Sequence, residues 1–369
     1  MHSAVTRFAV LVAVASAPVL AAVAATSASS AAASASQVPS STASAPAASA
    51  SSAADACSGG SKFDYFGVNE SCAEFGNQNV PGVLNTDYTW PSPSSIDYFM
   101  EDGMNAFRVP FLLERLAPPA TGMAGAFDQT YLGDLQETVQ YITGKGGYAI
   151  IEPHNFMIYN NATISSVDDF SAFWKNFAAL FADNTNVIFD LMNEPHDIDA
   201  SVVFDLMQAG VNAVRAAGAT EQLVLVEGTS WTGAWTWTTS GNSDVFGALT
   251  DPNDNVAIEM HQYLDSDGSG SHEVCVSPTI GSERLQAATE WLKANNLRGL
   301  LGEIGAGSNA DCISAVSDAM CYLQQQNGTW LGALWWAAGP WWGDYYQSIE
   351  PPNGPALASI YTEALLPFV

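Results

Sequence analysis

The chain has 369 residues and carries 38 acidic side chains against 10 Lys and Arg, which gives a formal net charge of -28. Because so acidic a chain is repelled by phosphate backbones and by anionic lipid, we expect no nucleic acid and no membrane among its partners, whereas a neutral substrate is compatible. Hydrophobic residues make up 48% of the sequence, enough to bury a sizeable core.

The N-terminal residues have the organisation of a secretory signal peptide. Arg7 supplies a positive charge, residues 8–20 form an apolar run, and residues 21–25 offer small side chains for cleavage. A membrane anchor is the alternative, but the apolar run gives way to Ala and Ser. We therefore expect residues 1–25 to be a signal peptide and the protein to be secreted.

Residues 26–56 are dominated by Ser and Ala. This composition buries too little apolar area to fold, so we expect a disordered tail or linker, followed by one catalytic domain over residues 57–369. Secretion makes the five cysteines candidates for disulfides, with at least one left over, and Cys57 can pair with Cys72 across the first predicted strand. N-glycosylation sequons begin at Asn69, Asn161 and Asn327, and a position at a strand end is expected to make the first one inaccessible.

From residue 63 onward, strand-like runs alternate with helix-like runs. The predicted strands span residues 63–69, 105–111, 148–155, 187–192, 223–231, 256–263, 299–307 and 331–339. The predicted helices span residues 94–102, 129–144, 166–182, 199–217, 283–295, 312–325 and 356–366, and only the segment 235–249 is weak.

This alternation predicts an α/β fold in which parallel strands close into a (β/α)8 TIM barrel. The alternative is an open doubly wound sheet, but that fold favours a Gly-rich turn after the first strand. The segment 67–76 does not have the required spacing.

The fourth strand ends in Asn193, Glu194 and Pro195. Proline cannot continue the ladder, so a carboxylate and an amide are expected at the C-terminal mouth of the barrel, where catalytic groups sit. The alternative is a satisfied acid before a turn.

Acidic residues end several of the apolar runs: Glu152, Glu194, Glu227, Glu259 and Glu303. Two carboxylates from different strands suffice for glycoside hydrolysis, one as acid and the other as nucleophile or base. The residue pattern alone does not select the pair.

Other chemistries fit less well. A zinc site built from His154, Glu194, His196 and His261 lacks tight ligand spacing, and Ser230 does not stand in a G-x-S-x-G elbow. We therefore expect no metal and no organic cofactor.

Several motifs, in this order, resemble those of fungal cellulases of glycoside hydrolase family 5. They are FRVPF at Phe107, IIEPHN at Ile150, FDLMNEPHD at Phe189, HQYLDSDGSG at His261, LLGEIG at Leu300 and WWAAGPWWG at Trp335. The resemblance implies that Glu194 is the acid/base and Glu303 the nucleophile, and it leaves the other strand-end acids structural.

The resemblance also implies supporting and sugar-binding residues around the pair: Arg108, His154, Asn155, Asn193, His261, Tyr263 and Trp336. Arg108 and Tyr263 would keep Glu303 ionised by donating hydrogen bonds to it. Trp231 and Trp341 are candidates for neighbouring subsites, with a place in the core as the alternative.

The resemblance further implies a disulfide between Cys275 and Cys312, and we expect Cys321 to be a buried free thiol. The resulting interpretation is a monomeric, secreted, retaining endo-β-1,4-glucanase whose partner is a β-glucan. The alternatives are a β-mannanase, a β-1,3-glucanase, or a catalytically silent carbohydrate-binding protein of the cell wall.

Overall fold

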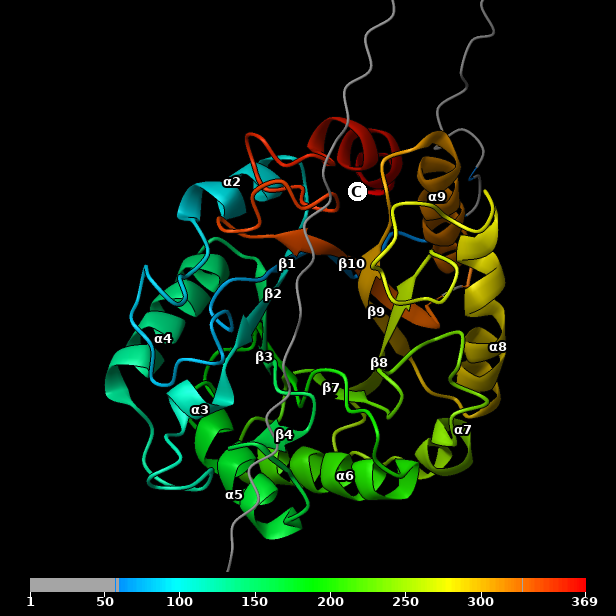
Figure 1. The fold of residues 1–369 in the computed structure, drawn as a ribbon. Coiled ribbons are helices and arrows are strands. Elements are labelled where there is room, and N and C mark those ends of the chain that lie inside the picture. Colours follow the sequence, from blue (N-terminus) through cyan, green and yellow to red (C-terminus); the bar gives the residue numbers. More distant parts are fainter. Residues whose placement is uncertain (1–56, 58–59, 327) are drawn as a thin grey trace, which may run out of the picture. The chain divides into compact units, whose positions relative to one another are not determined.

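The computed structural model describes residue 57 and residues 60–326 and 328–369. Eight parallel strands close into a barrel in the order β1-β10-β9-β8-β7-β6-β3-β2, with the helices outside it (Figure 1). The barrel strands are β1 (Tyr65–Glu70), β2 (Ala106–Phe111), β3 (Tyr148–Pro153), β6 (Val187–Asp190), β7 (Val224–Glu227), β8 (Val256–Tyr263), β9 (Gly299–Gly305) and β10 (Trp330–Ala338). The predicted TIM barrel is confirmed, while the predicted signal peptide and tail lie outside the described residues.

The helices follow the strands along the chain. They are α2 (Pro93–Glu101), α3 (Leu113–Leu116), α4 (Gln129–Gly144), α5 (Val167–Ala178), α6 (Ala200–Ala216), α7 (Asn242–Val245), η1 (Phe246–Ala248), α8 (Ile280–Ala294), α9 (Ala310–Gln324), η2 (Leu357–Leu365) and η3 (Leu366–Phe368). The weak segment after the fifth strand holds only the short α7 and η1. The sequence did not indicate α3 or the small hairpin of β4 (Ile158–Tyr159) and β5 (Ala162–Thr163).

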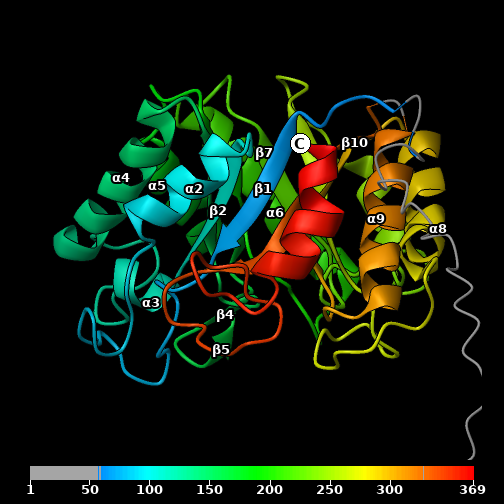
Figure 2. The ribbon, with the colours of Figure 1, turned by 90° about the horizontal axis from the view of Figure 1, so that it is seen from above.

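Local side-chain chemistry sets several helix ends. Asp128 accepts hydrogen bonds from the N–H groups of Thr130 and Tyr131 and so begins α4, and Ser166 Oγ accepts from the Asp169 N–H and begins α5. Seen from above, η2 lies beside β1 and α9 and completes the outer ring (Figure 2).

Two glycines allow β1 to pack closely against its neighbours β2 and β10, because a side chain at either position would collide with the adjacent strand. A Cβ on Gly67 would come 1.7 Å from the Ala106 carbonyl oxygen, and one on Gly332 would come 1.6 Å from that of Tyr65. No larger residue fits this seam without moving the backbone.

Apolar residues fill two cores on opposite faces of the strands. The larger core lies between the barrel and its helices. The smaller one is built from residues that alternate with it along the strands, such as Ile150, Ile188, Leu225 and Leu300, and it fills one end of the barrel interior. The other end is lined by polar side chains.

The disulfide predictions are half right. Cys275 pairs with Cys312 as expected, but Cys57 pairs with Cys321, so the predicted bond from Cys57 to Cys72 and the free thiol at Cys321 are both wrong. Cys72 is buried and unpaired. Cys72 follows the C-terminal end of β1, whereas Cys57 precedes its N-terminal end. Cys321, near the C-terminal end of α9, lies beside Cys57.

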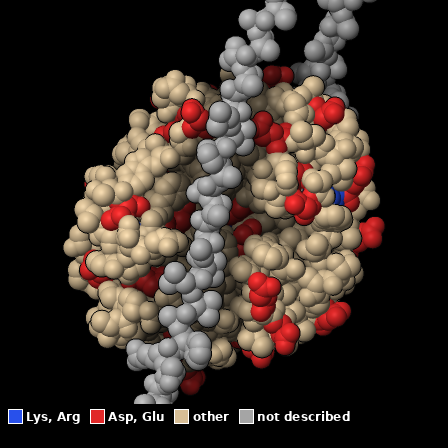
Figure 3. All heavy atoms as spheres, in the orientation of Figure 1, with Lys and Arg blue, Asp and Glu red and all other residues tan. Residues whose placement is uncertain are grey.

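The excess of acidic over basic residues is visible at the surface. On the face shown in Figure 3, acidic side chains are scattered over the surface and almost no Lys or Arg is visible. None of the described helices is long and apolar enough to span a bilayer.

Candidate active site

Every barrel strand places a polar or aromatic side chain near its C-terminal end: Asn69, Arg108, Glu152, Asp190, Glu227, His261, Glu303 and Trp336. Because parallel strands all end at the same mouth of the barrel, residues distant in sequence come together there. Most of them form one network of hydrogen bonds and ion pairs around Arg108.

Arg108 is fully buried and donates hydrogen bonds from all three nitrogens. Nη1 donates to Asn69 Oδ1 at 3.0 Å and to Glu303 Oε1 at 3.1 Å. Nη2 donates to Asn193 Oδ1 at 2.9 Å, and Nε donates to Asp190 Oδ2 at 2.9 Å. The guanidinium therefore fixes both the position and the charge of the Glu303 carboxylate.

Four further acids surround the same cation and are wholly buried: Glu152, Asp190, Glu227 and Glu259. Burial raises the pKa of Glu152, Asp190 and Glu227 well above the usual range, and the nearby cations only partly offset this. These carboxyl groups therefore retain protons where an exposed acid would be ionised.

Glu303, on β9, behaves differently from these acids. Its Oε1 accepts from Arg108, and its Oε2 accepts from the Tyr263 hydroxyl at 2.5 Å. Burial alone would raise the pKa of Glu303, but the positive charges of His261 and Arg108 and the donated hydrogen bond hold it below the usual value. Glu303 is thus kept ionised.

Glu194, just after β6, is half-buried and has an unusual backbone. Its φ is +42°, a left-handed conformation that costs a side-chain-bearing residue about 1–3 kcal/mol. Glu227 Oε2 accepts a hydrogen bond from the Glu194 N–H at 2.7 Å, and His261 Nδ1 lies 2.8 Å from Glu194 Oε1. These contacts hold the Glu194 side chain over the mouth of the barrel.

His261 stands between the two glutamates. Its Nδ1 is 2.8 Å from Glu194 Oε1 and 3.5 Å from Glu303 Oε2. Burial lowers the pKa of His261, but the surrounding carboxylates, Glu303 foremost, raise it well above the usual value. One oxygen of each glutamate and a nitrogen of His261 all lie within 4.8 Å of one another.

A cavity of about 670 Å³ opens above these groups. Of the residues indicated by the sequence, it is lined by His154, Glu194, Trp231, His261, Tyr263, Glu303 and Trp336. The His154 ring stacks on Trp336 with centroids 5.6 Å apart, and Trp231 stacks on His196 at 4.6 Å. Flat aromatic faces therefore flank the two carboxylates.

Besides the buried Arg108, three other candidate residues do not line this cavity. Asn155 is engaged with the Leu113 N–H, Glu114 and the Ile158 carbonyl, and Asn193 is buried beneath the mouth between Arg108 and His154. Trp341 is partly exposed after β10.

Three further aromatic residues, which the sequence motifs did not indicate, line the cavity: Phe156, Trp235 and Tyr345. Trp235 is 48% exposed and carries the Arg284 guanidinium 4.3 Å from its ring centroid. The loop after β7 is rich in tryptophan, and this composition could have indicated Trp235 as a binding residue. Trp231 and Trp235 line the cavity, whereas Trp237 is buried.

Of the four zinc ligands considered from the sequence, only Glu194 and His261 come within ligand distance of each other, and His154 and His196 do not join them. Within the described part of the chain, the groups within ligand distance are Glu194–His261–Glu303, Glu227–Glu259–His261 and Asp265–Asp267–His272. The first coincides with the paired carboxylates, and the second belongs to the Arg108 network.

A (β/α)8 barrel with two close carboxylates of unlike environment at its mouth, flanked by aromatic faces, defines a glycoside hydrolase. The family profile "Cellulase (glycosyl hydrolase family 5)" matches residues 68–339. The chain belongs to this family.

Individual relatives agree with this assignment. Endo-beta-1,4-glucanase B of Emericella nidulans is 53% identical over 294 residues, which cover 80% of this chain and 88% of the relative. A structure of XacCel5A in complex with cellopentaose is 36% identical, with a TM-score of 0.78 over 83% of this chain and 99% of that one. The endo-beta-1,4-glucanase Xac0029 of Xanthomonas axonopodis pv. citri is 37% identical, with a TM-score of 0.78 over 83% and 99%.

Proposed function

We propose that the chain is a secreted, retaining endo-β-1,4-glucanase that hydrolyses internal bonds of cellulose and related β-glucans by double displacement. The observation that carries the mechanism is that one oxygen of Glu194 lies within 4.8 Å of one oxygen of Glu303. Retaining enzymes hold their carboxyl groups about 5–5.5 Å apart, whereas inverting enzymes need roughly 6.5–9.5 Å to admit a water.

In the first step, Glu303 attacks the anomeric carbon as the glycosidic C–O bond breaks. The proton of Glu194 passes to the departing oxygen, so the leaving sugar departs as a neutral alcohol. Arg108 and Tyr263, which hydrogen-bond Glu303, favour its ionised form before the attack.

In the second step, Glu194 takes a proton from water. The water oxygen attacks the anomeric carbon and displaces Glu303, which recovers its negative charge. His261 Nδ1, 2.8 Å from Glu194 Oε1, holds the acid/base in place through both steps. Two inversions at the same carbon leave the β-configuration unchanged.

The proposed substrate rests on the relatives and on the shape of the cavity. The relatives are endo-β-1,4-glucanases by name, and one matching structure contains cellopentaose. The faces of Trp336, Trp231 and Trp235 suit flat pyranose rings on either side of the carboxylates. No metal or cofactor is needed for these steps.

Secretion is supported by the two disulfides, which persist in oxidising compartments. Of the sequons, Asn161 is exposed, whereas the Asn69 amide is buried and donates to the Gly302 and Trp335 carbonyls. We propose Asn161 as a glycosylation site, residues 1–25 as a signal peptide and residues 26–56 as a tail.

A substrate panel tests the proposal. On carboxymethyl-cellulose, we expect viscosity to fall faster than reducing ends appear, because internal cleavage shortens long chains first. Mannan, laminarin and xylan serve as comparison substrates. Strong activity on mannan with none on the β-1,4-glucan would refute the proposed specificity.

A further inference from the structure

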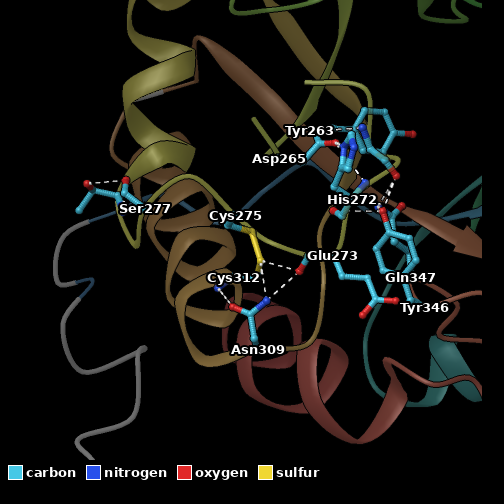
Figure 4. The surroundings of a disulfide bond; sticks show 12 residues. Tyr263, Asp265, His272, Glu273, Cys275, Ser277, Asn309, Cys312, Tyr346 and Gln347 are labelled. Atoms are coloured by element: carbon cyan, nitrogen blue, oxygen red, sulfur yellow. Dashed lines mark hydrogen bonds and ion pairs between the residues drawn. A yellow bond between two sulfur atoms is a disulfide. The ribbon is translucent and has the colours of Figure 1, made fainter. Parts of the chain in front are cut away.

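The segment after β8, residues 264–276, folds back against Tyr263 (Figure 4). We propose that Asp265 is a positioning residue for the nucleophile: it keeps this loop closed on the Tyr263 ring, which in turn aims its hydroxyl at Glu303. The inference rests on the proposed role of Glu303 as the nucleophile.

The Asp265 side chain contacts four consecutive residues of the loop, 269–272. Its Oδ1 accepts the Gly270 N–H at 3.0 Å, and its Oδ2 accepts the N–H groups of Ser271 and His272, each at 3.2 Å. The Ser269 hydroxyl and His272 Nδ1 lie 3.2 Å and 3.0 Å from the same oxygen. Burial raises the pKa of Asp265, but these donors, the Gly270 N–H first, hold it below the usual value, so the acceptor is a carboxylate.

The loop presents the bare backbone of Gly270 to the Tyr263 ring. A Cβ on Gly270 would come 2.4 Å from Tyr263 Cδ1, and one on Gly305 of β9 would come 2.7 Å from Tyr263 Cε1. Two glycine backbones therefore pack against the Cδ1–Cε1 edge of the ring and leave no room for a side chain at either position. In this position its hydroxyl donates to Glu303 Oε2 at 2.5 Å.

Other contacts anchor the loop to the body of the protein. The Gly270 carbonyl accepts hydrogen bonds from the Tyr346 hydroxyl and, at 3.2 Å, from the buried Gln347 Nε2 (Figure 4). The Val276 N–H donates to the Leu264 carbonyl at 3.1 Å, and the Cys275–Cys312 disulfide ties the loop's end to α9. The two ends of the loop and the Gly270 carbonyl are thus held from outside the loop, and Asp265 holds the N–H groups of residues 270–272 from within it.

The variant Asp265→Asn tests this chain of contacts. It preserves the shape of the side chain but turns one oxygen that accepts hydrogen bonds into an NH2 group facing other donors. We expect kcat to fall roughly 10- to 100-fold with little change in KM, as for Tyr263→Phe, which removes a hydrogen bond to a charged group. In both variants the acid limb of kcat/KM should move to higher pH, because Glu303 loses a donor.

The double variant separates positioning from simple stabilisation of the loop. If Asp265 acts through Tyr263, Asp265→Asn should lower kcat by less than about threefold in the Tyr263→Phe background. Independent losses that multiply, or an acid limb that does not move, would overturn the inference.

Gly270→Ala gives a second test if Asp265→Asn folds poorly. The added methyl should displace the Tyr263 ring and reproduce the loss in kcat and the pH shift. Gly146→Ala is the matched control, because Gly146 is also left-handed, with a φ of +88°, but nothing lies within 4 Å of its added Cβ. We expect this control to lose some stability and no activity.

An activated 2-deoxy-2-fluoro cellobioside separates the role of Glu303 as nucleophile from the positioning role of Asp265. It should label Glu303 in the wild type and, roughly 10- to 100-fold more slowly, in Asp265→Asn. Labelling of another residue in the wild type would refute the proposed function. Labelling of Glu303 at the wild-type rate in Asp265→Asn would refute only the positioning role.

Discussion

At the residue scale, two glutamates at one barrel mouth receive different surroundings. Glu303 is buried and accepts hydrogen bonds from Arg108 and Tyr263, which favour its anion. Glu194 is half-buried, has a left-handed backbone and contacts His261. Environments this different assign different tasks to chemically identical groups.

These tasks predict that the choice of substrate matters for one of two isosteric variants and not for the other. Glu303→Gln should abolish turnover of every substrate, because no nucleophile remains. Glu194→Gln should lower kcat on cellulose by about 10²–10⁴-fold but spare the first step with activated aryl glycosides, whose leaving groups need no proton. Steady-state and burst kinetics measure both effects.

Glu137→Gln is the control for this pair, since Glu137 is exposed on α4 outside the active-site cavity. It should behave as the wild type. Equal losses on both substrate classes for Glu194→Gln would contradict its role as acid.

At the element scale, apolar periodicity was sufficient to find all eight barrel strands, because each strand is buried and each ends at a polar residue or turn. Strand alternation also places Glu259, His261 and Tyr263 on one face of β8. The contact of Arg108 with Glu303 was expected from the sequence. Its contacts with four further acids, Glu152, Asp190, Glu227 and Glu259, were not, since they depend on the direction that the Arg108 side chain takes inside the barrel.

The disulfides show a second limit at this scale. Cys57 and Cys72 are near each other in sequence, but β1 lies between them, and six strand residues span about 20 Å. The helix before β10 instead brings Cys321 back to Cys57. The Cys57–Cys72 bond predicted from their closeness in sequence was therefore wrong, because β1 carries the chain from one end of the barrel to the other.

The Cys57–Cys321 bond closes a loop with a sequence separation of 264 residues. On the chain-entropy account, Cys321→Ser should lower the free energy of unfolding by about 5–6 kcal/mol. Because the bond lies at the end of the barrel opposite the site, kcat should not change. Thermal or denaturant unfolding measures the loss.

Cys72→Ala is the matched variant, because Cys72 is buried but forms no disulfide. We expect a smaller loss, about 1 kcal/mol. A loss for Cys321→Ser no larger than this would show that the disulfide contributes little to stability.

At the scale of the whole molecule, buried acids should make the protein most stable in acid. Burial, together with the neighbouring Glu350, raises the pKa of Glu70 well above its usual value, as burial does for Glu152, Asp190 and Glu227. The native state then binds more protons than the unfolded chain, so stability falls as pH rises from the unfolded pKa, about 4.3 for Glu, towards the raised values. The lowered pKa of Glu303 acts in the opposite direction, but only at low pH.

Thermal midpoints measured from pH 4 to pH 8 should therefore decline as pH increases. Glu70→Gln should flatten this decline, because Glu70 is wholly buried and an amide keeps its contact with Ser95 without titrating. A thermal midpoint that rises from pH 4 to pH 8 would contradict the proposed effect of the buried acids. A decline that is equally steep in Glu70→Gln would show that Glu70 does not contribute to it.

The central claim is double displacement by Glu303 and Glu194, and the most direct test is the configuration of the first product. Proton NMR recorded during hydrolysis of a soluble β-1,4-glucan oligosaccharide by the intact enzyme resolves the two anomers before they interconvert. The separation of the carboxylates predicts that the β-anomer appears first and the α-anomer follows only by mutarotation. Initial release of the α-anomer would contradict the mechanism.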